Sequence, residues 1–377
     1  MDDKLADFFF YGTLRHLPLL RIVLGRDVAD PAPEAARLAD HGVFQVDETP
    51  FPHFAAAPGC EAVGILVRGV TEEETQRLRF YEGGFDFDVR PVLVELESGD
   101  TVRAEVFYPD ADHAPSERRW SLSDWERDWS EISVCAADEV MAWYGRKSAD
   151  EIAVAFPSIR RRASALVAGR RRTPDPERNL SRDVIVAAHH HPYAKFFSLQ
   201  EIDVQVRQYD GAMSEVLNRA AILVGEAAVV LPYDPVRDCV MLVEQFRAPV
   251  FMAGDPAPWI WEPIAGLLEP GEAAETAARR EALEEAGLSL GQLESAGEMY
   301  SSTGSSTEYL HLFVGLADLG GDVTGTGGTD EGEDIRSKVI GYSELMQGID
   351  AGHYKDMPLV TTALWLARHR DRLRTSP

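Results

Sequence analysis

The sequence contains little of what stabilises secreted or membrane proteins. Only three cysteines, Cys60, Cys135 and Cys239, occur in 377 residues, and their wide spacing excludes a disulfide framework and a zinc-binding pair. The most apolar stretch, around 220–233, contains Glu226 and is too short to cross a bilayer. The first residues, MDDKLADFFFYGTL, lack the basic and apolar regions of a secretory signal. We therefore expect free thiols and a cytoplasmic location.

Positive charge is also scarce. The chain has 37 Lys and Arg against 63 Asp and Glu, a net charge of −26 at pH 7. This balance argues against broad binding to nucleic acid or to an anionic membrane, although a metal ion can still bring an anionic nucleotide to an acidic protein. The length and the hydrophobic content of 45% suffice for two domains with their own cores.

One acidic segment carries a strong chemical signal. The stretch 273–286 contains no Gly or Pro and predicts a helix that ends at Gly287. On that helix Glu281, Glu284 and Glu285 share one face, because they are spaced i, i+3 and i+4. Like charges this close are unfavourable unless a cation lies among them, and carboxylate oxygens suit Mg²⁺ or Mn²⁺. The alternative, a solvated acidic helix face, does not explain the glycine and arginine spacing around it.

That spacing runs from Gly266 through Glu272 and Arg280 to Gly287. With the three helical glutamates it resembles the signature of the Nudix family, whose members hydrolyse a diphosphate linked to another group. The resemblance implies that the carbonyl of Ala265 and the glutamates Glu281, Glu284 and Glu285 bind metal, with Glu285 also a catalytic candidate. It also implies that Gly266, Glu272, Arg280 and Gly287 form the scaffold of the motif.

The segments that flank the signature are similar to the ADP-ribose pyrophosphatase branch of that family. They are 241–247, 261–266, 302–308 and 330–336. The resemblance implies cleavage of ADP-ribose to AMP and ribose 5-phosphate, with Mg²⁺ or Mn²⁺ as cofactor. It also implies a homodimer formed through the Nudix domain. It assigns the general base to Glu331, a metal contact to Glu333, and substrate binding to Arg247 and Glu308.

Three alternatives stay open in these flanks. The acidic loop with Glu331 can be a solvated turn, and Arg247 can form a surface salt bridge. Thr303 stands where the ADP-ribose branch often has proline, which leaves related nucleoside diphosphate sugars as substrates.

A second motif lies near the beginning of the chain. Residues 11–14, Tyr-Gly-Thr-Leu, follow a strand pattern, and Glu82-Gly83 follows a helix pattern about seventy residues later. The pair resembles the gamma-glutamylcyclotransferase-like (AIG2-like) fold. The resemblance implies that backbone amides of Tyr11, Gly12, Thr13 and Leu14 hold a substrate carboxylate, and that Glu82 moves a proton while 5-oxoproline is released. Asp88 stands where such proteins often have tyrosine, so the alternative is an inactive barrel that binds a metabolite or stabilises the dimer.

Patterns along the chain divide it into three parts. Strand patterns occur at 8–11, 64–70, 89–97, 101–108, 196–209, 221–233, 239–246, 309–316 and 335–341, and helix patterns at 71–81 and about 359–373. We predict domains at 1–110, 111–182 and 183–377. The fold class is α+β with two domains, an N-terminal gamma-glutamylcyclotransferase-like β-barrel and a C-terminal Nudix α/β/α sandwich, joined by a helical linker. The fusion resembles tellurite-resistance-associated Nudix proteins.

Other conspicuous residues have plainer interpretations. We expect His189–His191 to lie in a loop. The arginine triplets 160–162 and 170–172 should lie on solvated helix faces or contact the acidic Nudix half, and the tryptophans of 120–143 should form a core seam where helices pack on the barrel. The leading hypothesis is a metal-dependent ADP-ribose diphosphatase. The others are a protein whose main activity is that of a cyclotransferase, with a regulatory Nudix half, and a sensor that binds ADP-ribose without fast turnover.

Overall fold

The chain divides into two compact units, 1–219 and 220–377, each with its own core. The structure, a computed structural model, describes residues 5–28, 31–46, 49–83, 87–109, 118–320, 326–327 and 334–375. Within these ranges, no helix is both long enough and apolar enough to span a membrane. The three cysteines are free thiols.

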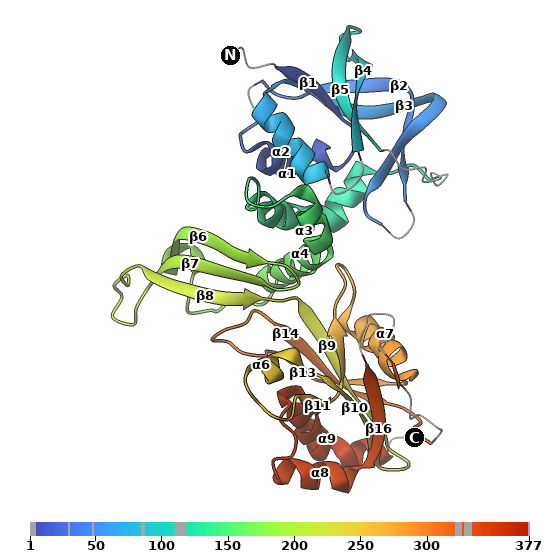
Figure 1. Ribbon diagram of the computed structural model, residues 1–377, viewed down its shortest axis with the longest axis vertical. Coiled ribbons are helices and arrows are strands. Elements are labelled where there is room, and N and C mark those ends of the chain that lie inside the picture. Colours follow the sequence, from blue (N-terminus) through green and yellow to red (C-terminus); the bar gives the residue numbers. More distant parts are fainter. Residues whose placement is uncertain are drawn as a thin grey trace. The chain divides into compact units, whose positions relative to one another are not determined.

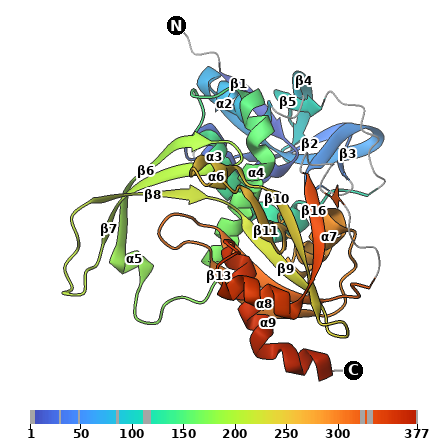
Figure 2. The same cartoon turned by 60° about the horizontal axis from the view of Figure 1, so that its bottom comes forward.

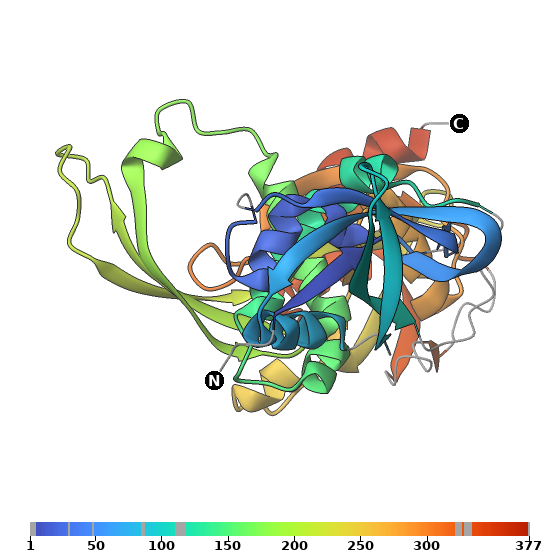
Figure 3. The same ribbon diagram turned by 90° about the horizontal axis from the view of Figure 1, so that it is seen from above.

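The first unit contains a closed β-barrel (Figures 1 and 3). Its strands are β1 (Ala6–Phe10), β2 (Glu34–Gln45), β3 (Pro52–Val70), β4 (Phe87–Leu96) and β5 (Thr101–Pro109), in the order β1-β3-β2-β4-β5. β1 pairs antiparallel with β3 and parallel with β5, and this last pairing closes the barrel. The hairpin β4–β5 turns across Ser98–Asp100, as the sequence predicts.

Successive side chains of β1 point to opposite faces of the strand, and both faces are buried. Phe9 packs with Phe54 and Leu66 in a cluster of barrel residues, whereas Phe8 and Phe10 pack on the opposite side in a cluster that includes helical residues. A strand with large apolar residues on both faces needs a cover, and the helices of this unit provide it.

Four helices accompany the barrel, besides the short 3₁₀ turn η1 (Thr13–Arg15). They are α1 (Leu17–Leu24), α2 (Glu72–Glu82), α3 (Leu122–Met141) and α4 (Ala149–Arg170). A reciprocal capping box between Thr71 and Glu74 begins α2. Trp125 of α3 is buried in the same cluster as Phe8 and Phe10, so the predicted tryptophan seam between helices and barrel is confirmed.

A three-stranded sheet follows the helices. It consists of β6 (Val184–Ala194), β7 (Ser198–Val206) and β8 (Leu217–Leu223), preceded by the short α5 (Leu180–Asp183); β8 runs across the division between the units. The prediction of a loop at His189–His191 is wrong, because these residues lie inside β6, where His189 pairs with Ile202. Cross-strand polar partners explain the difference: His189 contacts Gln200 at 2.7 Å and His190 contacts Asp203 at 3.1 Å.

The second unit is a mixed sheet with helices on both faces. Its strands are β9 (Glu226–Asp234), β10 (Cys239–Phe246), β11 (Trp259–Glu262), β12 (Ile264–Leu267), β13 (Leu293–Tyr300), β14 (Tyr309–Leu316), β15 (Thr326–Gly327) and β16 (Ile335–Gly341). Its helices are α6 (Ala248–Met252), α7 (Ala274–Ala286), α8 (Tyr342–Asp350) and α9 (Met357–Thr375). β9 pairs with β14 in parallel and with β10 and β12 in antiparallel orientation.

The two faces of β9 and β10 are buried by different helices (Figure 2). Val230 and Met241 pack with Ala278 of α7, whereas Leu231 and Leu242 pack with the α8 and α9 residues on the other face. Both strands are therefore nearly continuous apolar runs, as expected for strands covered on two sides. The predicted barrel and the predicted helix–sheet–helix sandwich are both present, and the domain boundaries at 110 and 182 remain predictions.

One arginine of the predicted solvated triplets lies inside the protein. Arg162 of α4 is 4% exposed, and it donates to Glu139 of α3 through Nε at 3.1 Å and through a terminal nitrogen at 2.6 Å. It also donates to the carbonyl of Phe196 at 2.8 Å. Arg171 of the second triplet does lie at the surface, where it pairs with Glu131. A run of charged residues in the sequence can therefore contain a buried side chain, so its residues have to be placed one by one.

Replacing Arg162 by Ala should destabilise the first unit by about 3–5 kcal/mol, because Glu139 would be left buried without its cation. Denaturant unfolding followed by tryptophan fluorescence measures the change. The matched control is Arg171→Ala, which removes an exposed pair and should cost less than about 1 kcal/mol. Equal effects of the two changes would contradict the role of the buried pair.

Candidate functional site

The acidic helix of the second unit begins after a loop that leaves the central sheet. Ala265 and Gly266 lie in β12, where they pair with Val229 and Ala228 of β9. α7 starts at Ala274 and ends at Gly287, which has φ +60°, a conformation that glycine adopts without strain. The helix predicted from the sequence is therefore confirmed.

Gly266 lies directly against the carboxylate of Glu281. A Cβ atom at position 266 would overlap both carboxylate oxygens of Glu281, so only glycine fits here without a shift. β12 and the acidic face of α7 thus meet at one point. The side chain of Glu281 is 13% exposed, which places a mostly buried carboxylate beside the backbone of residues 265 and 266.

Arg280 connects the loop to the helix. Its guanidinium forms two parallel hydrogen bonds with Glu272, each 3.0 Å long, and donates to the carbonyl of Leu267 at 3.1 Å. Such a bidentate pair fixes geometry as well as charge. The hydrogen bonds to Glu272, together with the nearby Glu281, raise the pKa of Arg280 well above its ordinary value. The arrangement fits the predicted scaffold.

The same guanidinium also contacts two of the helical glutamates. One terminal nitrogen lies 2.6 Å from Glu281 and 3.0 Å from Glu284. Glu284 is 53% exposed at its side chain, whereas Glu285 is 6% exposed. Among the residues that the structure describes, no three His, Cys, Asp or Glu side chains come together closely enough to form a metal site. The hard carboxylate oxygens on this face of α7 nevertheless match the preference of Mg²⁺.

Arg247 forms an ion pair within the protein. Its Nε lies 2.8 Å from Glu262, and its terminal nitrogen lies 3.0 Å from the second carboxylate oxygen. Asp356, which precedes α9, interacts electrostatically with both Arg247 and Glu308. Burial raises the pKa of Asp356, Arg247 opposes the shift and Glu308 adds to it. Arg247 and Glu308, the two residues predicted to bind substrate, therefore both act on the charge of Asp356.

Glu262 and Asp356 were missed by sequence reasoning. Glu262 precedes the signature and Asp356 lies about seventy residues after its end, and only the fold brings them to Arg247. Glu331 and Glu333, the predicted base and metal contact, lie outside the described residues. Thr303 lies in an exposed turn in which the amides of Ser305 and Ser306 donate to the carbonyl of Ser302.

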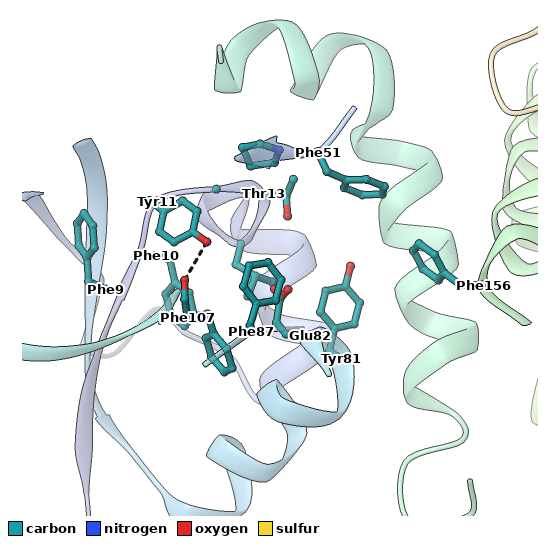
Figure 4. A pocket seen from close by; sticks show the side chains of 13 residues that line it. Phe9, Phe10, Tyr11, Thr13, Phe51, Tyr81, Glu82, Phe87, Phe107 and Phe156 are labelled. Carbon is teal, nitrogen blue, oxygen red and sulfur yellow. Dashed lines mark hydrogen bonds between the residues drawn. The ribbon is translucent and has the colours of Figure 1, made fainter. Parts of the chain in front are cut away.

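The first unit contains a pocket at the Tyr-Gly-Thr-Leu motif (Figure 4). Residues 11–14 form one wall, and Tyr81 and Glu82 at the end of α2 form another. Figure 4 shows the side-chain oxygens of Tyr11, Thr13, Tyr81 and Glu82 directed toward one space. The remaining wall is aromatic, with Phe9, Phe10, Phe51, Phe87, Phe107 and Phe156. The structure therefore brings together the two parts of the predicted N-terminal site.

Burial perturbs the acid in this pocket. Desolvation by the apolar walls raises the pKa of Glu82 to about 7. Burial, and then the nearby Glu82, raise the pKa values of Tyr11 and Tyr81, and the hydroxyl of Tyr11 donates to the carbonyl of Phe107 at 2.9 Å. A carboxyl group that titrates near neutral pH can take up and release a proton during a reaction. Asp88, at the position that departs from the family pattern, is exposed and pairs with Arg90.

Comparisons with known proteins identify a family for each of the two parts of the chain that carry these motifs. A model of the NUDIX domain matches residues 224–358, and a model described as gamma-glutamyl cyclotransferase, AIG2-like, matches residues 8–127. The ADP-ribose pyrophosphatase of Escherichia coli (strain K12) is 36% identical over 192 residues, which cover 51% of this chain and 91% of that protein. The chain belongs to the Nudix family.

Other Nudix relatives differ in the substrate that their names give. The ADP-ribose pyrophosphatase of Haemophilus influenzae is 32% identical over 197 residues, covering 52% of this chain and 91% of that protein. The GDP-mannose pyrophosphatase of Cronobacter sakazakii is 31% identical over 169 residues, covering 44% and 85%. The chain is thus a Nudix diphosphatase that hydrolyses a nucleoside diphosphate derivative, and it carries an AIG2-like domain at its N-terminal end.

Replacing Gly266 by Ala should lower Nudix hydrolysis at least about 100-fold, because a methyl group would displace the Glu281 carboxylate and a misplacement of about 1 Å has this effect at a reacting centre. Steady-state rates with a nucleoside diphosphate sugar measure the loss. Gly341→Ala is the control, since a Cβ there meets nothing within 4 Å. An unchanged rate in Gly266→Ala would contradict the importance of the contact.

Proposed function

We propose that the Nudix unit hydrolyses ADP-ribose to AMP and ribose 5-phosphate with a divalent metal ion. The observation that carries the proposal is the mostly buried Glu281 held against Gly266, on the helix face that also bears Glu284 and Glu285. The two relatives named ADP-ribose pyrophosphatase are the more similar of those compared, at 36% and 32% identity. ADP-ribose is therefore favoured over GDP-mannose as the substrate.

The residues of α7 and of the segment before it have two roles, metal binding and support of the metal site. The carbonyl of Ala265 and the carboxylates of Glu281, Glu284 and Glu285 would hold Mg²⁺ or Mn²⁺. A bound ion of this kind neutralises charge on the two phosphates and acidifies a water molecule. Arg280 and Glu272 fix the loop relative to the helix, so the carboxylates keep their direction.

Charge compensation explains the position of Arg280. In the structure its terminal nitrogen lies between Glu281 and Glu284, where it relieves the repulsion between them. The bidentate bonds to Glu272 keep the guanidinium beside the acidic face without filling it. Arg247, which Glu262 orients, would bind a phosphate oxygen of the substrate.

A substrate panel tests this assignment: AMP or GMP release from ADP-ribose, ADP-glucose and GDP-mannose, with Mg²⁺ and with EDTA. We expect ADP-ribose to give the highest kcat/KM and EDTA to abolish turnover. Glu285→Gln should lower kcat at least about 100-fold, as loss of one group that acts in the transition state does.

The matched control is Glu275→Gln, which changes an exposed glutamate in the first turn of the same helix. Preference for another substrate would overturn the ADP-ribose assignment, and turnover in EDTA would overturn the metal. Tight binding of ADP-ribose without turnover would support the sensor alternative.

We also propose a second activity, gamma-glutamyl cyclotransfer, for the N-terminal unit. The specific observation is that Glu82 lies in an apolar pocket beside residues 11–14 and has a pKa near neutral. In this reaction the α-amine of a gamma-glutamyl compound attacks its own γ-carbonyl carbon, and the bond from that carbon to the leaving amine breaks. Glu82 takes the proton from the attacking nitrogen and passes it to the leaving nitrogen, so 5-oxoproline and a free amine result.

The pH dependence of 5-oxoproline release tests this role of Glu82. A base must be deprotonated to act, so kcat/KM should fall about tenfold per pH unit as the pH drops below the pKa of Glu82, which is about 7. Glu82→Gln should abolish release, whereas Glu72→Gln, an exposed change at the start of the same helix, should leave it intact. A pH-independent rate between pH 5 and 8 would count against Glu82 as the base.

We propose that the chain forms a homodimer. The sheet β6–β8 supports this assembly, because several of its apolar side chains are exposed, namely Ile185, Val186, Tyr193, Val206 and Ile222, at 37–53%. Light scattering should give twice the chain mass of 41.7 kDa, and a mass of one chain at micromolar concentration would contradict the dimer. The cytoplasmic location and the link to tellurite resistance stay predictions from the sequence.

A further inference from the structure

A second cavity lies beside the pocket around Glu82. The two cavities share the side chains of Tyr81 and Phe156. The second one is lined otherwise by Phe80, Val140, Ala149, Ile152 and Ala153. Apart from the Tyr81 hydroxyl, these side chains carry no polar atom. A polar group that entered this space would lose its hydration without a hydrogen bond in return, whereas an apolar group would gain from burial.

The lining comes mainly from a part of the chain that the AIG2-like model does not match. That match ends at residue 127, whereas Val140 lies near the end of α3 and Ala149, Ile152, Ala153 and Phe156 lie on α4. The helical extension thus contributes directly to the cavity beside the candidate catalytic acid.

The extension is held firmly in this position. α4 begins with a reciprocal capping box between Ser148 and Glu151, and Arg162 connects it to Glu139 of α3. Its first turn also packs on the Glu-Gly turn, since a Cβ at Gly83 would lie only 3.1 Å from the Cβ of Ala149. The distance between Glu82 and the apolar cavity is therefore set by packed helices.

Aromatic rings lie where the two cavities adjoin. The rings of Phe51 and Phe156 are 6.3 Å apart, and the guanidinium of Arg160 lies 5.1 Å above Phe51. Figure 4 shows Tyr81 between Glu82 and Phe156. A compound whose carboxylate is held at residues 11–14 and whose γ-carbonyl lies at Glu82 can extend past Tyr81 toward this aromatic wall.

We propose that the N-terminal unit acts on gamma-glutamyl amides whose leaving amine carries an apolar group, either aromatic or branched aliphatic. The inference rests on the proposed cyclotransferase reaction and adds its substrate class. The apolar group occupies the cavity between α2, α3 and α4, while the gamma-glutamyl part occupies the pocket of residues 11–14 and Glu82. A small amine would leave this cavity empty, and a charged amine would lose its hydration on entering it.

Two substrates and two variants of the full chain test the proposal. The ratio of kcat/KM for gamma-glutamyl-phenylalanine over gamma-glutamyl-alanine, measured by 5-oxoproline release, should be at least about tenfold in the native protein. Ala153→Trp fills the cavity and should lower this ratio at least about tenfold. Val154→Trp places the same bulk on α4 at a residue that is 86% exposed, and it should leave the ratio unchanged.

The outcomes separate the inference from the reaction on which it rests. Turnover with equal or better use of gamma-glutamyl-alanine overturns the apolar substrate class and leaves the cyclotransferase standing. If neither compound is turned over, the cyclotransferase is overturned. Calorimetric titration of binding then tests whether the cavity is an apolar subsite. Binding of gamma-glutamyl-phenylalanine that Ala153→Trp abolishes and Val154→Trp keeps supports the cavity as an apolar subsite, and no binding by the native protein overturns it.

Discussion

The Nudix site depends on one cation that belongs to the protein itself. The guanidinium of Arg280 holds Glu272, the carbonyl of Leu267, Glu281 and Glu284 together. Without it, the carboxylates of Glu281 and Glu284 on α7 would repel each other, and the loop after β12 would lose its contact with the helix. Because Gly266 has no side chain, Glu281 can then lie against the backbone of β12, whose position the central sheet fixes.

The N-terminal site depends on burial instead of charge pairing. Glu82 lies among aromatic side chains, and the loss of hydration brings its pKa close to neutral. The α3–α4 extension contributes to this environment, since Phe156 belongs to the pocket and α4 packs against the turn after Glu82. A helical segment that reads as a linker in the sequence is therefore part of the pocket wall.

Local periodicity made the acidic helix predictable. A helix repeat of 3.6 residues places Glu281, Glu284 and Glu285 on one face whatever the rest of the fold does, and Gly287 marks the end of α7. The apolar strands of the second unit were found for a similar reason. The pairing of Arg247 with Glu262 and its nearness to Asp356 were not predictable, because they arise from residues brought together only by the tertiary structure. Arg162 shows the same limit, since its partner Glu139 lies on a different helix.

The central claim is that the face of α7 beside Gly266 binds the metal ion used in hydrolysis. Mn²⁺ binding followed by electron paramagnetic resonance tests it without relying on turnover. The account predicts a bound Mn²⁺ in the native protein, a much weaker one in Glu281→Gln, and native affinity in Glu275→Gln. Native affinity in Glu281→Gln would contradict the account, because the ion would then be held elsewhere.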